Sequence, residues 1–342
     1  MTPEPKGPGA AWTGSFPPGP PQARRRSDEG RRRLKGPRRR EESRVPDAEF
    51  TSYYGRPVIK EPAWGVPDVP GYLFLGGLAG ASSVLAAGAE VSGYGELARV
   101  AKVGALGAIS LSAVALVHDL GRPERFVNML RVFKPSSPMS VGSWLLSAYG
   151  PAAGAAAVSD LTGILPAAGK TATVGAALLG PAIATYTAAL ICDTAVPGWH
   201  EGHREMPYLF ASSASCAAAG LGLLTLPPAA ARPARTLATL GAPAELVARR
   251  LLLRRLGDIA EPYETGRPGL LLRAAEALTV GGLAGAVLGR RNRAVSALAG
   301  ASLLAASALT RFGVFEAGMA TTRDPKYTII PQRRRRDRLG IN

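Results

Sequence analysis

The side chains best suited to moving a proton, or to holding a polar ligand, gather in three short stretches at the ends of apolar runs. These are VHDLGRPERF with its continuation VNMLRVFKPSSPMS, then ICDTAVPGWHEGHREMPY and TRFGVFEAGMA. Charged groups beside hydrocarbon are costly unless they are paired or functional. Arginine, histidine, aspartate and tryptophan around an apolar cleft would suit a ligand with an apolar tail and a protonatable head. The candidates are His118, Asp119, Arg122, Asp193, Trp199, His200, Glu201, His203, Arg204, Arg311 and Glu316.

Two interpretations of this set stay open, because the same carboxylates and arginines could simply form salt bridges that cap a helical bundle. Tyr186 adds to the case for a site. It precedes Asp193 by seven residues, so the two side chains fall on nearly the same face of a helix. A hydroxyl and a carboxylate aligned in this way could pass a proton or hold a quinone carbonyl. A tyrosine bonded to a neighbouring helix is an equally simple explanation.

Residue counts and spacing argue against a metal centre or a catalytic triad. The chain has 3 histidines and 2 cysteines, and two thiols fall short of the four that an iron–sulfur cluster typically takes. His200 and His203 lie in a loop rather than mid-helix, which disfavours haem, and HEGH lacks the HExxH spacing of a helical zinc site. We therefore expect no haem, no iron–sulfur cluster, no metal and no catalytic residue in this chain.

The three stretches must be positioned by the apolar runs between them. These runs, rich in Ala, Gly, Leu and Val, are about 20 residues long, which matches the roughly 30 Å hydrocarbon core of a bilayer. The sequence predicts an all-α, polytopic membrane bundle whose small residues let helices pack closely. Glu245, Arg249 and Arg250 make the sixth run the weakest. The eight predicted spans are 70–91, 98–118, 140–160, 171–192, 206–227, 236–253, 270–289 and 294–313.

The distribution of basic residues predicts the orientation of the bundle. With eight spans, the side that holds both termini carries 29 lysines and arginines against 8 on the opposite side. The positive-inside rule then places both termini in the cytoplasm, in a multi-pass protein of the cell membrane. We divide the chain into a disordered basic tail (1–50), a pre-helix segment (51–69), a transmembrane domain (70–320) and a basic C-terminal tail (321–342).

The net charge of +16 could indicate nucleic-acid binding, but its placement argues for a different partner. The arginine triplets that begin at Arg24, Arg31 and Arg38 sit among Pro, Gly, Ser and Glu, and such a segment cannot bury a core. No basic fold with interleaved aromatic residues accompanies them. An anionic membrane surface is the natural partner for a basic tail on a membrane protein. We therefore expect contact with membrane lipid and not with nucleic acid.

Several long blocks of the sequence, in the right order, resemble the NrfD family, the membrane subunits of polysulfide-reductase and nitrite-reductase type complexes. The resemblance covers about residues 51 to 333, and the Ala- and Arg-rich style looks actinobacterial. The blocks are SYYGRPVIKEPAWGVPDVPGYLFLGGLAGASSVLAAGAE, HDLGRPERFVNMLRVFKPSSPMSVGSW, DTAVPGWHEGHREMPYLFA, ALTRFGVFEAG and TRDPKYTIIPQ.

The resemblance implies two four-helix halves, one of which binds a quinone, expected to be menaquinone. It implies that electrons pass between quinone and a four-cluster, ferredoxin-like iron–sulfur subunit that serves a molybdopterin oxidoreductase subunit. Some relatives are thought to couple this chemistry to proton movement. Tyr186 matches the family's helical tyrosine, Asp193 closes the fourth helix, and the family's HxLGRP-like motif falls on His118, Asp119 and Arg122. The first helix lacks the Asn or His that some relatives present there.

Residue roles follow as expectations. The quinone-binding or proton-relay candidates are His118, Asp119, Arg122, Tyr186, Asp193, Trp199, His200, Arg311 and Glu316; the partner-docking candidates are Arg125, Glu201, His203 and Arg204. Gly121 and Pro123 break the helix, so Arg122 can stay with the cleft while Arg125 faces a partner. A purely structural anchor and a proton-coupled transporter are the alternatives. No internal repeat is evident, and the polar residues gather near one face rather than at midplane, which disfavours a transporter.

Overall fold

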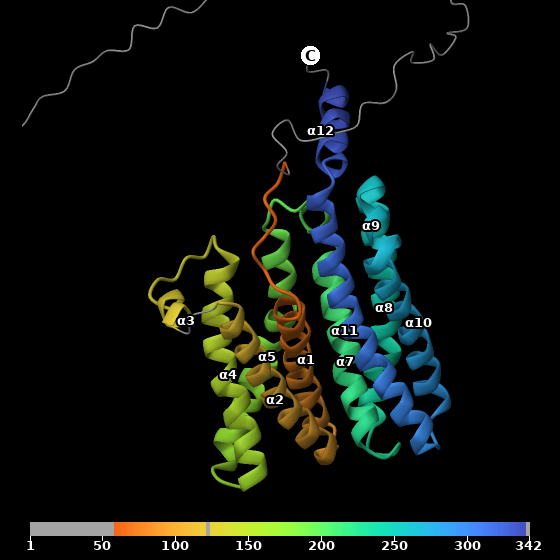
Figure 1. Cartoon of the computed structure of the whole chain (residues 1–342). Helices are drawn as coiled ribbons and strands as arrows, with labels where there is room; N and C mark the ends of the chain where they lie inside the picture. The colour runs from red at the N-terminus through yellow and green to blue at the C-terminus, as the bar shows by residue number, and fades with distance from the viewer. Residues whose placement is uncertain (1–57, 121–123, 340–342) are drawn as a thin grey trace, which may run out of the picture. The chain divides into compact units, whose positions relative to one another are not determined.

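The computed structural model describes residues 58–120 and 124–339, which belong to one compact unit of the chain, and this part consists of helices and turns without strands. The predicted basic tail over residues 1–50 lies outside the described residues. The described residues contain eight long helices, and these run side by side in Figure 1. They are α1 (Asp68–Val91), α2 (Gly95–Asp119), α4 (Pro138–Thr162), α5 (Pro166–Cys192), α7 (Met206–Thr225), α8 (Arg232–Leu256), α10 (Gly266–Leu288) and α11 (Arg293–Arg323).

Short elements connect or extend the long helices. They are α3 (Glu124–Met129), α6 (Pro197–His200), the 3₁₀ turn η1 (Gly257–Ala260), α9 (Glu261–Glu264) and α12 (Lys326–Leu339). Part of the expected C-terminal tail is therefore helical. The all-α fold predicted from the apolar runs is confirmed, and each predicted span coincides with one long helix.

Length and composition support membrane crossing for six of these helices among the described residues: α1, α2, α5, α7, α10 and α11. The other two, α4 and α8, are long enough but less apolar, so the count of eight spans remains a prediction. In α8 the charges that interrupt the apolar pattern mostly turn toward protein. Glu245 is buried, and Arg249 forms an ion pair of 2.9 Å with Glu276 of α10.

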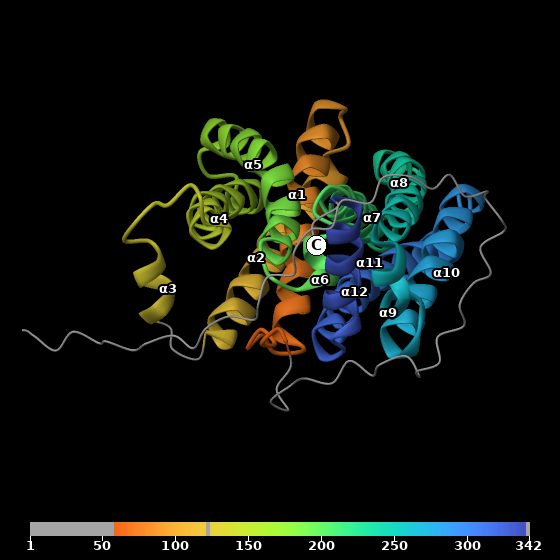
Figure 2. The ribbon, with the colours of Figure 1, turned by 90° about the horizontal axis from the view of Figure 1, so that it is seen from above.

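The long helices form two groups of four. One half contains α1, α2, α4 and α5, the other contains α7, α8, α10 and α11, and the halves meet chiefly where α7 packs against α1 and α5. Figure 2 shows the two groups from above. Both halves contain very close backbone approaches, as between Gly80 and Gly180 in the first and between Gly220 and Gly300 in the second. A β-carbon at any of these positions would run into the facing backbone, which is the role of small residues in membrane helix packing.

Successive long helices alternate in direction, so one end of the bundle collects the beginning of α1, the end of α2, the beginning of α4 and the end of α5. The same end collects the beginning of α7 and the end of α11, with α12 beyond it (Figure 1). We name this the tail-side end. The described residues of the three polar stretches lie toward this end, although they are spread over more than 200 positions of the chain.

Candidate functional site: a polar pocket in the first half

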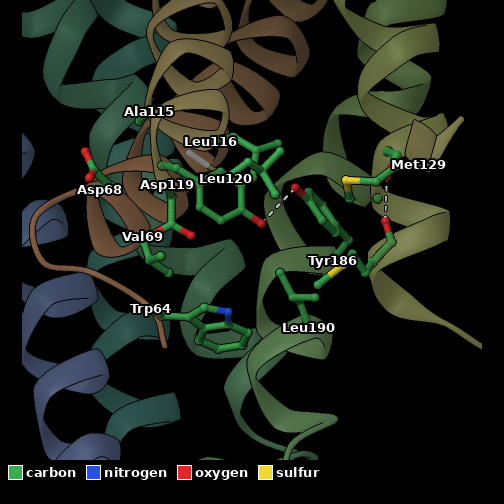
Figure 3. A pocket seen from close by; sticks show the side chains of 14 residues that line it. Trp64, Asp68, Val69, Ala115, Leu116, Asp119, Leu120, Met129, Tyr186 and Leu190 are labelled. Carbon is green, nitrogen blue, oxygen red and sulfur yellow. Dashed lines mark hydrogen bonds between the residues drawn. The ribbon is translucent and has the colours of Figure 1, made fainter. Parts of the chain in front are cut away.

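A partly open pocket lies at the tail-side end of the first half, lined by α1, α2, α4, α5 and the segment that precedes α1 (Figure 3). Its volume is about 80 Å³, and most of its lining is apolar. The polar side chains that reach it include Asp68 and Tyr72 from α1, Asp119 from α2 and Tyr186 from α5. Figure 3 shows Trp64 and Asp119 around the same space as Tyr186. A mostly apolar pocket with a few convergent polar groups is the usual form of a small-molecule site.

Two tyrosines from different helices meet at this pocket. The hydroxyls of Tyr72 and Tyr186 lie 2.9 Å apart and share a hydrogen bond in which either can be the donor. Tyr72 is 4% exposed, and its own carbonyl accepts a hydrogen bond of 3.2 Å from Ser112. The ring of Tyr186 rests on Gly142 of α4, where a β-carbon would collide with it. The glycine therefore lets the phenol reach across to α1.

Two carboxylates lie at the mouth of the pocket. Oδ1 of Asp119 accepts a hydrogen bond of 3.2 Å from the backbone N–H of Gly65, which ties the end of α2 to the segment before α1. Asp68 is the first residue of α1, where a negative charge is favourable, and its Oδ2 lies 2.9 Å from Nδ1 of His118. The His118 side chain is 77% exposed. It therefore connects a pocket-lining carboxylate to the surface of the bundle.

The tryptophan that lines the pocket is Trp64, whereas the sequence had suggested Trp199. Trp199 is fully buried, and its indole N–H donates a hydrogen bond of 2.9 Å to the carbonyl of Val314. Trp64 stacks on it with ring centroids 5.8 Å apart. Trp199 thus supports the pocket from behind and does not reach its lining.

Arg311 lies in the closed interior and not in the pocket. Its side chain is 0% exposed, Nη2 donates a hydrogen bond of 2.7 Å to the carbonyl of Phe210, and Cζ lies 3.9 Å from the centre of the Phe210 ring. Glu245 of α8 is near enough to interact electrostatically with it and accepts a hydrogen bond of 3.0 Å from Thr310. Such a placement indicates a packing role in the second half.

The loop candidates lie apart from the pocket lining. Asp193 is exposed at the end of α5, two turns beyond Tyr186, and does not line the pocket. Nδ1 of His200 lies 3.2 Å from the carbonyl of Cys192, and Nδ1 of His203 lies 2.9 Å from the carbonyl of His200. These contacts stabilise the conformation of the segment between α5 and α7.

The remaining candidates are at the tail-side surface or outside the described residues. Glu201 contacts Arg335 of α12 at 3.0 Å, and Glu316 contacts Arg267 at 3.4 Å. Arg204 is exposed. Arg122 lies outside the described residues, and the structure does not describe the side chain of Arg125.

Tyr263 of α9 contacts α6 and anchors the tail-side end of the second half. Its hydroxyl donates a hydrogen bond of 2.8 Å to the carbonyl of Gly198 in α6. Burial raises the pKa of Tyr263, so the phenol stays neutral and keeps its proton for this bond.

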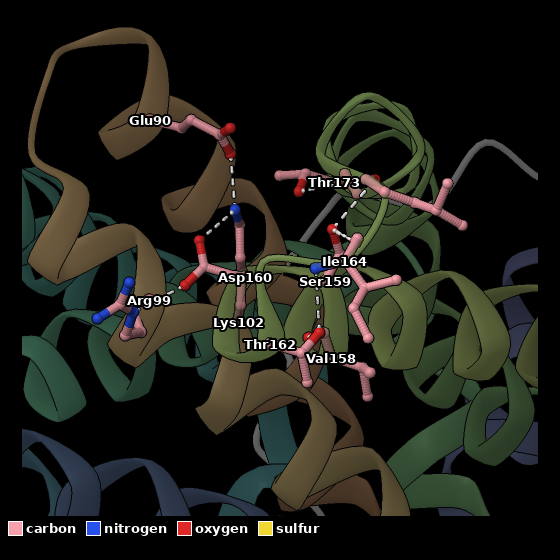
Figure 4. A network of polar contacts seen from close by, with 11 residues as sticks. Glu90, Arg99, Lys102, Val158, Ser159, Asp160, Thr162, Ile164 and Thr173 are labelled. Carbon is pink, nitrogen blue, oxygen red and sulfur yellow. Dashed lines mark hydrogen bonds and ion pairs between the residues drawn. The ribbon is translucent and has the colours of Figure 1, made fainter.

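A second polar cluster lies at the opposite end of the first half (Figure 4). Nζ of Lys102 on α2 lies 2.8 Å from Glu90 of α1 and 3.2 Å from Asp160 of α4, and Arg99 contacts Asp160 at 2.9 Å. The Lys102 side chain is 6% exposed. Two cations and two carboxylates balance in charge here, so the cluster joins three helices without leaving a free charge for a ligand.

Sequence reasoning missed three pocket residues: Trp64, Asp68 and Tyr72. A signal was available for two of them, because Asp68 and Tyr72 are four residues apart and therefore share a helix face at the start of the first span. Neither was recognisable as a partner of Tyr186 without knowing that α1 and α5 are neighbours. Among the described residues, no group of three or more His, Cys, Asp or Glu side chains comes together that could hold a metal ion.

The fold and the pocket define a class of protein: a helical membrane protein with a mostly apolar pocket at one end of one half. A family profile described as "Polysulphide reductase, NrfD" matches residues 59–252, which is more than half of the chain. The chain belongs to the NrfD family, the membrane subunits of quinone-linked oxidoreductase complexes. The matched region contains the first half and the whole pocket. No curated protein sequence matches the chain at a significant level.

Proposed function

We propose that this chain binds the head group of menaquinone in the tail-side pocket and serves as the quinone-reactive subunit of a respiratory oxidoreductase complex. The observation that carries the proposal is the Tyr72–Tyr186 pair, in which hydroxyls from two helices meet 2.9 Å apart at the pocket lining. When bound, the quinone would supply two-electron, two-proton redox chemistry.

The pocket residues suit both redox forms of such a head group. A quinone offers carbonyls that accept hydrogen bonds, and a quinol offers hydroxyls that also donate them. A tyrosine hydroxyl can do either, and an ionised carboxylate such as Asp119 accepts. The cavity is partly open, so an attached apolar tail would leave through the opening into the lipid. Trp64 and the apolar lining would contact the ring.

The electrons would come from or go to other subunits. We propose the family's usual arrangement, in which a four-cluster iron–sulfur subunit docks on the complex and serves a molybdopterin subunit. The tail-side end offers exposed charged side chains for such docking, among them His203, Arg204 and residues 333–336 of α12. We further propose that the complex lies in the cell membrane with both termini in the cytoplasm, as the basic residues favour.

Extraction of lipid from purified protein tests the proposal. The complex is isolated in mild detergent through a tag on this chain, and menaquinone is quantified by mass spectrometry for wild type, Tyr72→Phe and Tyr186→Phe. We expect near-stoichiometric quinone in wild type and about tenfold less in each variant, because losing one buried hydrogen bond costs about 1–2 kcal/mol.

Tyr149→Phe is the matched control. Tyr149 is a buried tyrosine of the same half that donates to the carbonyl of Ala79 at 2.6 Å, outside the pocket. Its variant should keep its quinone. Folded wild type without any quinone, with partner subunits attached, would contradict the proposal and favour a structural anchor. Equal quinone in all variants would move the site away from the tyrosine pair.

A further inference from the structure

We propose that Asp68 and His118 form the route by which protons pass between the pocket and the water at the tail-side end of the bundle. The inference rests on the proposed quinone site. It adds to that site a path for its protons and names the end of the bundle to which the path leads. Neither the position of Asp68 at the pocket nor its contact with a histidine on another helix is evident from the sequence.

The first step of the route lies inside the pocket. Its lining contains four side chains able to bind or release a proton: Asp68, Tyr72, Asp119 and Tyr186. The two tyrosines are hydrogen-bonded to each other, and Tyr72 and Asp68 follow one another by one turn on the same face of α1. A proton bound or released beside Tyr72 therefore has a carboxylate one helical turn nearer to the tail-side end.

The second step leads out of the pocket. Oδ2 of Asp68 lies 2.9 Å from Nδ1 of His118, and the histidine is 77% exposed whereas the aspartate is 26% exposed. One hydrogen bond thus separates a pocket-lining carboxylate from an imidazole at the surface. Imidazole is the side chain best suited to exchange protons with water near neutral pH. The contact links α1 to α2, so it forms only when the two helices pack as they do here.

The other carboxylate of the pocket has a different role. Asp119 accepts the N–H of Gly65, and this bond holds the segment that carries Trp64 over the pocket. Deeper polar groups of the first half are already bound to one another, as in the 2.7 Å contact of Ser83 with Tyr149. Lys102, at the far end of the helices, is paired with two carboxylates. The pair of Asp68 and His118 joins the pocket lining to an exposed imidazole through one hydrogen bond.

The balance of the reaction fixes what the route must carry. One quinone takes up two electrons and two protons to give one quinol, and the reverse reaction releases the same numbers. The electrons travel through the iron–sulfur partner of the proposed complex. Both protons must cross the mouth of the pocket, so a fault in the route slows proton exchange without removing the quinone.

The experiment uses the complex purified through a tag on this chain with its bound quinone. Stopped-flow mixing with the reduced methyl viologen radical supplies electrons, two radicals per quinone, and a pH-indicator dye in weak buffer records proton uptake. We compare wild type with Asp68→Asn, His118→Ala and a control, Glu96→Gln. Glu96 is an exposed carboxylate in the first turn of α2, at the other end of the helix that carries His118.

We expect proton uptake per bound quinone to slow by roughly tenfold or more in Asp68→Asn and His118→Ala, as for the loss of a proton-transfer group. Quinone content should be unchanged in His118→Ala, because His118 is exposed and lies outside the pocket lining. Glu96→Gln should match wild type. Added imidazole should restore the rate of His118→Ala, which a merely structural role of His118 would not allow.

Wild-type uptake rates in both variants, at full quinone content, would overturn the inference while leaving the quinone site intact. A slow His118→Ala that imidazole does not rescue would also overturn it. If Asp68→Asn loses its quinone through misfolding, the proton-uptake rate of His118→Ala still tests the inference, because His118 is exposed. Wild-type complex without quinone would instead refute the proposed function.

Discussion

In each half of the bundle a large aromatic side chain packs on a glycine. In the first half the packing lies beside a pocket, and in the second it lies in the closed core. In the first half, the ring of Tyr186 rests on Gly142 beside a partly open pocket, and its hydroxyl meets Tyr72. At the second half, the indole of Trp199 rests on Gly318 of α11 and is fully buried. Packing of an aromatic ring on a glycine thus lines a pocket where the helices leave an opening, and it fills the core where they do not.

The halves also use charge differently. The second half places Arg311 and Glu245 in its interior, where both side chains are almost completely buried. The pocket of the first half relies on neutral hydroxyls, with its carboxylates kept at the mouth. The buried charges of the second half therefore lie away from the pocket, which forms where the helices of the first half leave an opening.

The largest effect that would test this contrast is expected at Arg311. Arg311→Ala removes the bond to Phe210 and the stacking on its ring, leaves a void and removes one of the two cations, Arg311 and Arg249, that interact with the buried Glu245. We expect a loss of about 3–5 kcal/mol in unfolding free energy, measured by thermal unfolding in detergent. Quinone per folded protein should stay at the wild-type level, and Glu245→Gln added to Arg311→Ala should recover part of the stability. A stable variant without quinone would instead move Arg311 into the site.

A smaller effect is expected at the far end of the first half. Lys102→Met leaves the carboxylates of Glu90 and Asp160 facing each other with Arg99 as the remaining cation, at a cost of about 1–3 kcal/mol. Arg99→Met is the control, because its exposed ion pair should contribute less than about 1 kcal/mol. Unfolding of both variants in detergent gives the comparison, and equal losses would show that burial of Lys102 does not matter.

Gly142→Ala should change binding more than stability. Its β-carbon pushes the Tyr186 ring away from Tyr72, so we expect quinone retention to fall by about tenfold, or about 1.4 kcal/mol. Gly150 of the same helix has nothing within 4 Å of a β-carbon, so Gly150→Ala should retain quinone and gain about 0.5–1 kcal/mol from helix propensity. Quinone extraction and unfolding are measured on both. Similar quinone content in the two variants would show that the position of Tyr186 does not affect quinone binding.

The smallest effect is expected in the surface contacts of the second half. A hydrogen bond from Lys326 lowers the pKa of Glu261, so the carboxylate stabilises the folded state above its unfolded pKa of about 4.3. This contribution is lost as the pH falls through the lowered folded value, and it is slight because both groups are exposed. Glu261→Gln should remove that part of the acid dependence of unfolding and leave quinone content unchanged. A loss of quinone would show that α9 and α12 communicate with the pocket.

The sequence by itself determined the helices, their places along the chain and the end of the bundle at which the polar stretches gather. Those properties follow from the lengths of apolar runs and from the alternation of successive helices, both of which are local in the chain. It also predicted His118, Asp119 and Tyr186 as quinone-binding or proton-relay candidates; the structure places Asp119 and Tyr186 in the pocket lining and His118 against Asp68. The NrfD resemblance is confirmed by the family profile.

Only the tertiary structure decided which face of each helix looks inward and which helices are neighbours. Runs of Ala, Gly and Leu are apolar all round, so they give no periodic signal for rotation about the helix axis. Tyr72 and Tyr186 are 114 residues apart, and their contact depends on the packing of α1 against α5 with Gly142 opposite. The same packing buried Trp199 and Arg311, brought Trp64 to the pocket and joined Asp68 to His118, because side chains on separate helices meet only where the packed backbones allow it.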